Sequence, residues 1–419
     1  MRRMRRLLLA VPLAAIAAVL VFTFGASANL TGSTFEGNDG NLVINTAGNT
    51  DWDSPAPNLS AANDVATGTG DNSFGQGTSQ SDVNVTVVSG SIPNSKADLA
   101  RFAVAGETVG ANSFLYLAWA RNNDAGSTNF DFEINKAAQP DLTTPGAKLL
   151  NRSTGDVLIS YSYQGNNLSP SLALRTWGAS GWSGPTDLSG CSEGHGNDAN
   201  VQDDIISPTL ARTTGRWGEA AINLTCAGIV PAGACEGFTS AHVSSRASQS
   251  FNSEVKDFIA PVTLSFSNCG AIEVTKTTKV PGKTGPQPQA GVNFSLDGGT
   301  AVPTDANGKV CFNALALGNH SVTETVPAGY QADGLTTKTV NVQAVGSCSS
   351  GATAVSFSNS PLTDVTISVD SKADGGTAST VTCDDASLGF TTGATGDGTD
   401  TSDQIAGSKT IKCTIVIDP

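Results

Sequence analysis

Three polar side chains stand at apolar positions of short β-like runs between Cys269 and Asn359. They are a lysine, Lys276, a glutamate, Glu324, and an asparagine, Asn359. Side chains of a strand alternate between its two faces. Each of the three therefore shares a face with the apolar residues of its own run, which are Ile272 and Val274, Val322 and Val326, and Val355 and Phe357. The pattern predicts that all three point into a core.

Burial gives these three groups a specific chemistry. A buried Lys or Glu avoids the cost of an isolated charge by becoming neutral. A neutral Lys276 amine is a nucleophile, and a protonated Glu324 can polarise a carboxamide and relay protons. Asn359 supplies an electrophilic carbon with ammonia as the leaving group. Together they predict an intramolecular amide cross-link between Lys276 and Asn359.

The surrounding motifs resemble the prealbumin-like domain of Gram-positive pilins and adhesins, the Cna protein B-type or SpaA-type module. The matching pieces are Val-x-Lys276, the Thr-Asp-x-x-Gly turn from 304 to 308, the Glu-Thr-x-Pro-x-Gly-Tyr run from 324 to 330, and Phe-x-Asn359. The resemblance covers residues 270–360. It implies a small β-sandwich in which Lys276 and Asn359 form an isopeptide bond and Glu324 is the catalyst.

Two features depart from that family. Thr277 and Thr278 replace the acidic residue usual after the first-strand lysine, and Cys311 and Cys348 offer a disulfide in the same module. Such a disulfide would stabilise the module by roughly 3 to 4 kcal/mol in the chain-entropy model, which would make an isopeptide dispensable. The alternative is then that Lys276 snorkels at a strand end, Asn359 caps its strand and Glu324 is half exposed.

The amino-terminal segment indicates export. Residues 1–28 carry four arginines, an apolar run and an Ala-Ser-Ala cleavage site, the pattern of a secretory signal peptide. An uncleaved membrane anchor is the alternative, because the apolar run is long. Without those arginines, 19 basic against 37 acidic residues leave a net charge of −18. This acidity argues against nucleic acid or an anionic membrane as a partner after signal cleavage.

All eight cysteines lie at or beyond Cys191, and in an exported chain an even number indicates disulfides. Their order along the chain pairs Cys311 with Cys348 and Cys383 with Cys413. The first four allow three pairings, of which Cys191 with Cys226 and Cys235 with Cys269 is favoured. The short paired spacings of a zinc site are missing, so no metal is expected at these cysteines.

The chain is expected to be all-β, with several β-sandwiches. Residues 29–269 hold short alternating runs separated by turn residues, typical of a large sandwich or jelly roll. Within them, 218–224 and 238–247 are the best candidates for short helices. Residues 361–419 read as a third, small β domain stapled by Cys383 and Cys413.

Two weaker ligand patterns occur in the first region. Trp177 and Trp182 flank a hairpin tip, where exposed rings would suit stacking on sugars, although rings packed on each other fit the pattern too. Acidic and Asn-rich loops offer oxygens to calcium, without the spacing of an EF-hand. These loops are 38–41, 51–53, 197–200 and 203–204. No cofactor is expected, with calcium as the alternative.

No motif for turnover of an external substrate is present. His195, His242 and His320 are scattered and are expected on the surface or in turns. The sequence therefore predicts a structural or adhesive protein, not an enzyme, that is extracellular or on the surface of a Gram-positive cell. Its partners would be extracellular or cell-wall components, such as glycans or host and matrix proteins. The alternative is a secreted carbohydrate-binding protein that uses its first sandwich.

Overall fold

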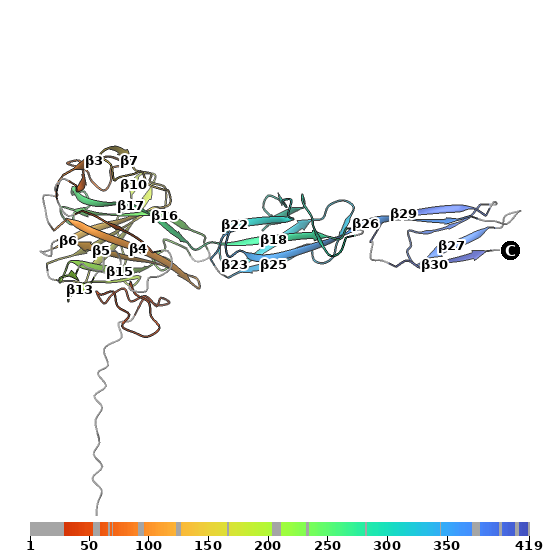
Figure 1. Ribbon diagram of the computed structural model, residues 1–419, viewed down its shortest axis with the longest axis horizontal. Coiled ribbons are helices and arrows are strands. Elements are labelled where there is room, and N and C mark those ends of the chain that lie inside the picture. The colour runs from red at the N-terminus through yellow and green to blue at the C-terminus, as the bar shows by residue number, and fades with distance from the viewer. Residues whose placement is uncertain are drawn as a thin grey trace, which may run out of the picture.

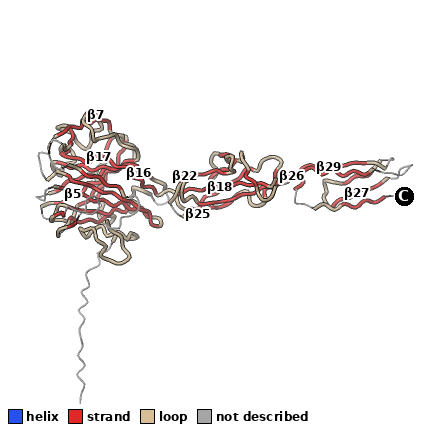
Figure 2. Tube along the Cα trace, viewed as in Figure 1, coloured by secondary structure: helices blue, strands red, loops and turns tan. Residues whose placement is uncertain are grey.

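The computed structural model describes residues 29–417, except 53–58, 66–67, 69, 91–95, 123–126, 166, 203–210, 232–233, 281–282, 344, 371–377, 394–395 and 407–409. The described residues form strands and turns without a helix, as Figure 2 shows. The fold is all-β, with several sheets packed in pairs. The predicted signal peptide, residues 1–28, lies outside the described residues. Within the described part of the chain, no helix long and apolar enough to cross a membrane occurs.

Two large antiparallel sheets form the first sandwich (Figure 1). In spatial order the five-stranded sheet consists of β1 (Ser60–Asn63), β4 (Leu99–Val109), β5 (Asn112–Arg121), β15 (Trp217–Asn223) and β12 (Ser192–Gly196). The seven-stranded sheet runs β10 (Gly181–Trp182), β9 (Ser171–Gly178), β8 (Val157–Tyr163), β6 (Thr128–Asn135), β16 (Gly237–Arg246) and β17 (Val255–Ser267), with β11 (Thr186–Asp187) also on β9.

Each face of the five-stranded sheet is buried, because period-two alternation sends apolar side chains both ways. Phe102, Leu117 and Trp119 point into the main core between the two large sheets. On the opposite face, Tyr116 packs against Phe35 of the amino-terminal segment, with ring centroids 4.0 Å apart. The five-stranded sheet is therefore packed against apolar side chains on both faces.

Smaller sheets complete the first unit. Strands β2 (Asn72–Phe74), β3 (Asn84–Ser89) and β7 (Gly146–Leu149) form a three-stranded sheet, and β13 (Val201–Gln202) pairs with β14 (Ala211–Arg212). Phe74 of β2 stacks on Phe258 of β17, with ring centroids 4.2 Å apart. This contact fastens the three-stranded sheet onto the seven-stranded one.

The prediction of two short helices is wrong. Residues 218–224 belong mainly to β15 and residues 238–247 mainly to β16. Both strands lie in the interior of their sheets, β15 between β5 and β12 and β16 between β6 and β17. Their side chains are buried on both faces, so the alternation that marks a half-exposed strand is lost.

A second sandwich follows directly after β17. One sheet contains β19 (Gln287–Pro288), β18 (Gly270–Thr278), β26 (Thr353–Val369) and β24 (Tyr330–Ala332), with β22 (Lys309–Leu315) also on β18. The facing sheet contains β21 (Val302–Pro303), β20 (Asn293–Leu296), β23 (Gly318–Thr325) and β25 (Thr337–Val342). Their inner faces enclose a core that includes Val274, Phe294, Val322 and Phe357.

Strand β26 continues beyond the second sandwich into the last group of strands (Figure 1). Its first half pairs with β18 in parallel, and its second half pairs with β29 (Gly398–Ala406). Strands β28 (Gly389–Thr391), β27 (Ser379–Cys383) and β30 (Cys413–Ile417) form the remaining sheet. One uninterrupted strand thus connects the last two groups.

Four disulfides join the cysteines in the order expected along the chain. They are Cys191–Cys226, Cys235–Cys269, Cys311–Cys348 and Cys383–Cys413. Two lie in the first unit, one in the second sandwich and one in the last group of strands. Each closes its loop within a single unit.

Candidate isopeptide site

The second sandwich brings Lys276, Glu324 and Asn359 together. Lys276 lies on β18 and Asn359 on β26, which are neighbouring parallel strands of one sheet. The register places Lys276 opposite Phe357 and Thr278 opposite Asn359, so the lysine and the asparagine are diagonal neighbours on the same face. Glu324 comes from β23 in the facing sheet. The core-facing phase predicted for all three agrees with this placement.

A tight turn fixes the backbone beside the lysine. Gly308, in the Thr-Asp-x-x-Gly motif, has a φ of 70°, a left-handed conformation that glycine adopts without strain. Its carbonyl accepts the amide hydrogen of Lys276 at 2.7 Å. A Cβ on Gly308 would collide with the carbonyl oxygen of Lys276. The motif therefore positions β18 as well as closing a turn.

One carboxylate oxygen of Glu324 contacts both reaction partners. Lys276 Nζ lies 2.9 Å from Glu324 Oε1, and Asn359 Nδ2 donates a hydrogen bond of 2.7 Å to the same oxygen. Lys276 and Asn359 are 0% exposed and Glu324 is 5% exposed. Burial this complete leaves Lys276 no exposed strand end to which it could snorkel, and Glu324 is not half exposed.

The site shifts the amine of Lys276 toward its neutral form. Burial lowers the pKa of Lys276, and the hydrogen bond and charge of Glu324 oppose that shift only in part. Among the described residues, the second oxygen of Glu324 and the amide oxygen of Asn359 accept no hydrogen bond. Unpaired polar atoms in a core are expensive, which disfavours the unlinked site.

The geometry fits condensation of the amine with the carboxamide. Lys276 Nζ would attack the Cγ atom of Asn359, forming the Nζ–Cγ bond while the Cγ–Nδ2 bond breaks. Glu324 is placed to take a proton from the attacking amine and return it to the departing nitrogen, since its Oε1 contacts both. The products are an amide and one ammonia, so atoms and protons balance without an added reactant.

Trp177 and Trp182 form a packed pair on the first sandwich. They face each other across the β9–β10 hairpin, with ring centroids 5.1 Å apart and planes at 77°. The guanidinium of Arg152 lies 4.9 Å from one ring centroid and 5.1 Å from the other. Trp182 Nε1 also donates to the carbonyl of Gln80 at 2.9 Å. The two rings therefore pack around the guanidinium of Arg152, which is a structural role.

Trp182→Ala is expected to destabilise the first sandwich by about 1 to 3 kcal/mol, because it removes an aromatic contact and a cation–π contact. All five tryptophans lie within residues 52–217. Urea unfolding followed by tryptophan fluorescence therefore reports on this sandwich alone. Unchanged stability together with lost binding on a glycan array would instead favour the carbohydrate-binding alternative.

The structure brings together two of the acidic loops considered for calcium. Asp39 and Asp51 lie with Glu36 so that one oxygen of each is within 4.8 Å of the others. Glu36 already accepts hydrogen bonds from Asn45, Thr46 and Asn49. In loop 197–200, Asn197 bonds to backbone groups of its own region. Asp53 and loop 203–204 lie outside the described residues.

A buried histidine was missed by sequence reasoning. His242 is 2% exposed on β16, contrary to the expected surface position, and its Nε2 lies 3.6 Å from Glu133 Oε2. Burial lowers the pKa of His242. Arg152 binds both oxygens of Glu133 at 2.8 Å. Burial acts to raise the pKa of Glu133, but the charges of His242 and Arg152 outweigh it and lower that pKa.

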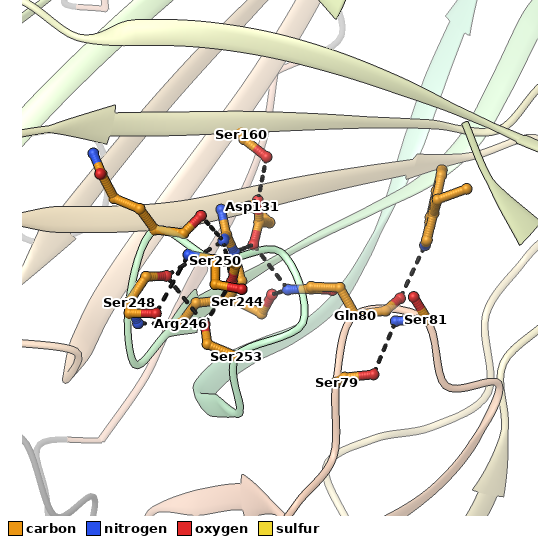
Figure 3. A network of polar contacts seen from close by, with 12 residues as sticks. Ser79, Gln80, Ser81, Asp131, Ser160, Ser244, Arg246, Ser248, Ser250 and Ser253 are labelled. Atoms are coloured by element: carbon orange, nitrogen blue, oxygen red, sulfur yellow. Dashed lines mark hydrogen bonds and ion pairs between the residues drawn. The ribbon is translucent and has the colours of Figure 1, made fainter. Parts of the chain in front are cut away.

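A second buried ion pair was also missed. Arg246 on β16 binds Asp131 on β6 through two nitrogens (Figure 3). Its third nitrogen donates to the backbone carbonyls of Ser248, Gln249 and Ser250. Neither residue follows a motif, and they are 115 positions apart. The pair anchors the loop after β16 to the sheet.

No protein-family model matches this sequence, and no curated protein matches it. Several solved structures of bacterial surface proteins are similar over much of the chain. The Bacillus anthracis TIE protein is 12% identical with a TM-score of 0.27, over 76% of this chain and 55% of that one. This chain therefore spans only about half the length of the TIE protein.

Two further similar structures are covered almost completely. The group B streptococcus pilus 2b backbone protein is 12% identical with a TM-score of 0.27, over 62% of this chain and 97% of that one. An adhesin from Mobiluncus mulieris, which contains intramolecular disulfide, isopeptide and ester bond cross-links, is 10% identical with a TM-score of 0.21. That match covers 64% of this chain and 93% of the adhesin. These TM-scores are low, so the cross-linking chemistry is inferred only from Lys276, Glu324 and Asn359 of this chain.

Proposed function

We propose that this chain is an exported structural or adhesive protein of a Gram-positive cell surface, with a second sandwich locked by a Lys276–Asn359 isopeptide bond. The observation that carries the proposal is the contact of both side chains with one buried oxygen of Glu324. The predicted signal peptide and the four disulfides support an extracellular location. The reaction occurs once per molecule and leaves no catalytic turnover.

The position of the bond explains what it would do. The chain enters the second sandwich through β18 and leaves it along β26, so tension between the first and last units acts on these two strands. Hydrogen bonds between β18 and β26 would carry that load alone without a cross-link. A covalent bond between Lys276 and Asn359 would pass the load directly from one strand to the other. The fold between them would then stay intact under force.

The intact mass of the non-reduced protein, with residues 1–28 removed, tests the cross-link. We expect a deficit of one ammonia beyond the hydrogens lost in four disulfides. Glu324→Ala is expected to restore the ammonia, because it removes the group that transfers protons between the two nitrogens. Peptide mapping should place the branched peptide at Lys276 and Asn359.

Asn268→Ala is the matched control for loss of an asparagine. Asn268 is also nearly buried near a strand end, but its amide bonds to the backbone of Glu236 and Ala234. The ammonia deficit should persist in this variant. A wild-type mass that four disulfides explain completely would refute the cross-link and leave a sandwich stabilised by Cys311–Cys348 alone.

A further inference from the structure

Four aspartates converge where three sheets of the first unit meet. Asp64 directly follows β1, Asp71 directly precedes β2, Asp98 directly precedes β4, and Asp257 lies within β17. These strands belong to the five-stranded, three-stranded and seven-stranded sheets. One carboxylate oxygen from each of Asp64, Asp71 and Asp257 lies within 4.8 Å of the others. The cluster is separate from the isopeptide site and from the acidic loops around Asp39.

The carboxylate of Asp71 is buried, and the described residues offer it no well-placed hydrogen-bond donor. Its residue is 0% exposed, and among the described residues neither of its side-chain oxygens accepts a hydrogen bond of good geometry. One oxygen of Asp64 is equally unpartnered. By contrast, Asp257 accepts backbone hydrogen bonds from Leu99 and Phe258, which aim its carboxylate at the cluster. A buried carboxylate to which the described residues offer no donor is unusual, so these oxygens are suited to accept a positively charged ligand.

The charges around these carboxylates indicate which kind of ligand they would bind. The charged neighbours that act on Asp64, Asp71 and Asp257 are other carboxylates of the same cluster, including Asp98. Burial, followed by this repulsion, raises the pKa of Asp64 to about 7 and that of Asp71 to about 6. Several acidic oxygens held close together are the ligand set of a hard divalent ion.

We propose that Asp64, Asp71 and Asp257 bind one calcium ion, with Asp98 beside them, and that the ion ties the three sheets together. Calcium suits the site better than magnesium, because its flexible coordination accepts carboxylates from separate strands without an ideal octahedron. A Kd of about 0.1 to 1 mM, typical of extracellular modules, would keep the site filled outside the cell. The ion would stabilise the first sandwich by connecting its three sheets.

Calorimetric titration of the EDTA-treated full mature chain with calcium chloride tests the site. We expect wild type to bind calcium and to unfold at a higher temperature when calcium is present, as followed by tryptophan fluorescence. Asp71→Asn should lose one bound ion or bind it at least about tenfold more weakly, because it removes a ligand charge. Asp39→Asn, in the other acidic cluster, is the matched control and should respond to calcium as wild type does.

Two results would overturn the calcium site. One is a wild type that neither takes up calcium at millimolar concentration nor gains thermal stability from it. The other is an Asp71→Asn variant that binds as many ions as wild type with the same affinity. If Asp71→Asn does not fold, Asp64→Asn is tested in its place. The mass of the cross-linked sandwich is measured separately, so this outcome does not depend on the isopeptide bond.

Discussion

Glu324→Ala is expected to make the second sandwich far less stable than in wild type. The substitution blocks the cross-link, whose loop of roughly eighty residues is worth about 4 to 5 kcal/mol in the chain-entropy model. It also leaves Lys276 buried without its carboxylate, which destabilises by about 3 to 5 kcal/mol. Differential scanning calorimetry should show the transition of this sandwich at a much lower temperature. The tryptophan-detected transition of the first sandwich should stay unchanged.

A double variant separates the two contributions. Lys276→Met with Glu324→Leu also prevents the cross-link, but it replaces the buried ion pair by apolar side chains of similar size. Such replacements are often neutral or stabilising. We therefore expect the double variant to lose the contribution of the bond and to be more stable than Glu324→Ala. Equal stability of wild type and Glu324→Ala would contradict both the bond and the burial argument.

The contribution of the Cys311–Cys348 disulfide to stability is measured in the same experiment. Cys311 on β22 is joined to Cys348 in the segment before β26, so it staples the same sandwich. Scans repeated under reducing conditions remove this bond but leave an isopeptide intact. After reduction, the second sandwich of wild type should keep a high transition temperature. Reduced Glu324→Ala has neither the isopeptide nor the disulfide, so it should lose most of its remaining protection against proteases.

The all-β class and the core-facing placement of Lys276, Glu324 and Asn359 could be predicted because period-two alternation is a local signal. Lys276, Glu324 and Asn359 each follow apolar residues in phase, and their half-exposed strands show that phase clearly. The turn at Asn307 and Gly308 likewise has a sequence signature. What the sequence could not supply is the register that makes Asn359 a diagonal neighbour of Lys276.

Fully buried strands and distant charges escaped prediction for different reasons. Strands β15 and β16 are covered on both faces, so their apolar and small residues show no alternation. Asp71 and Asp257 meet only because β2 packs on β17, and no local pattern records that contact. Asp131 and Arg246 are an equally distant pair, joined by the neighbouring strands β6 and β16. Topology, rather than composition, makes these sites.

Arg246→Ala is expected to lower the free energy of unfolding of the first sandwich by about 3 to 5 kcal/mol. Asp131 is 0% exposed, and without Arg246 its charge keeps, among the described residues, the hydrogen bonds from Ser160 and Gln80 (Figure 3). The loop after β16 also loses the donor shared by three of its carbonyls. Urea unfolding detected by tryptophan fluorescence measures the change, and Lys256→Ala serves as the partly exposed control.

The control and a double variant show whether the unpaired charge of Asp131 causes the loss of stability. Lys256 pairs with Glu254 at a partly exposed position, where ion pairs contribute about 0 to 1 kcal/mol. Asp131→Ala combined with Arg246→Ala removes both buried charges. If the stranded carboxylate dominates, the double variant will be more stable than Arg246→Ala, because the second substitution removes the unpaired charge. If the loop contacts dominate, the double variant will be the less stable of the two, and Arg246 acts mainly by holding residues 248–250 against the sheet.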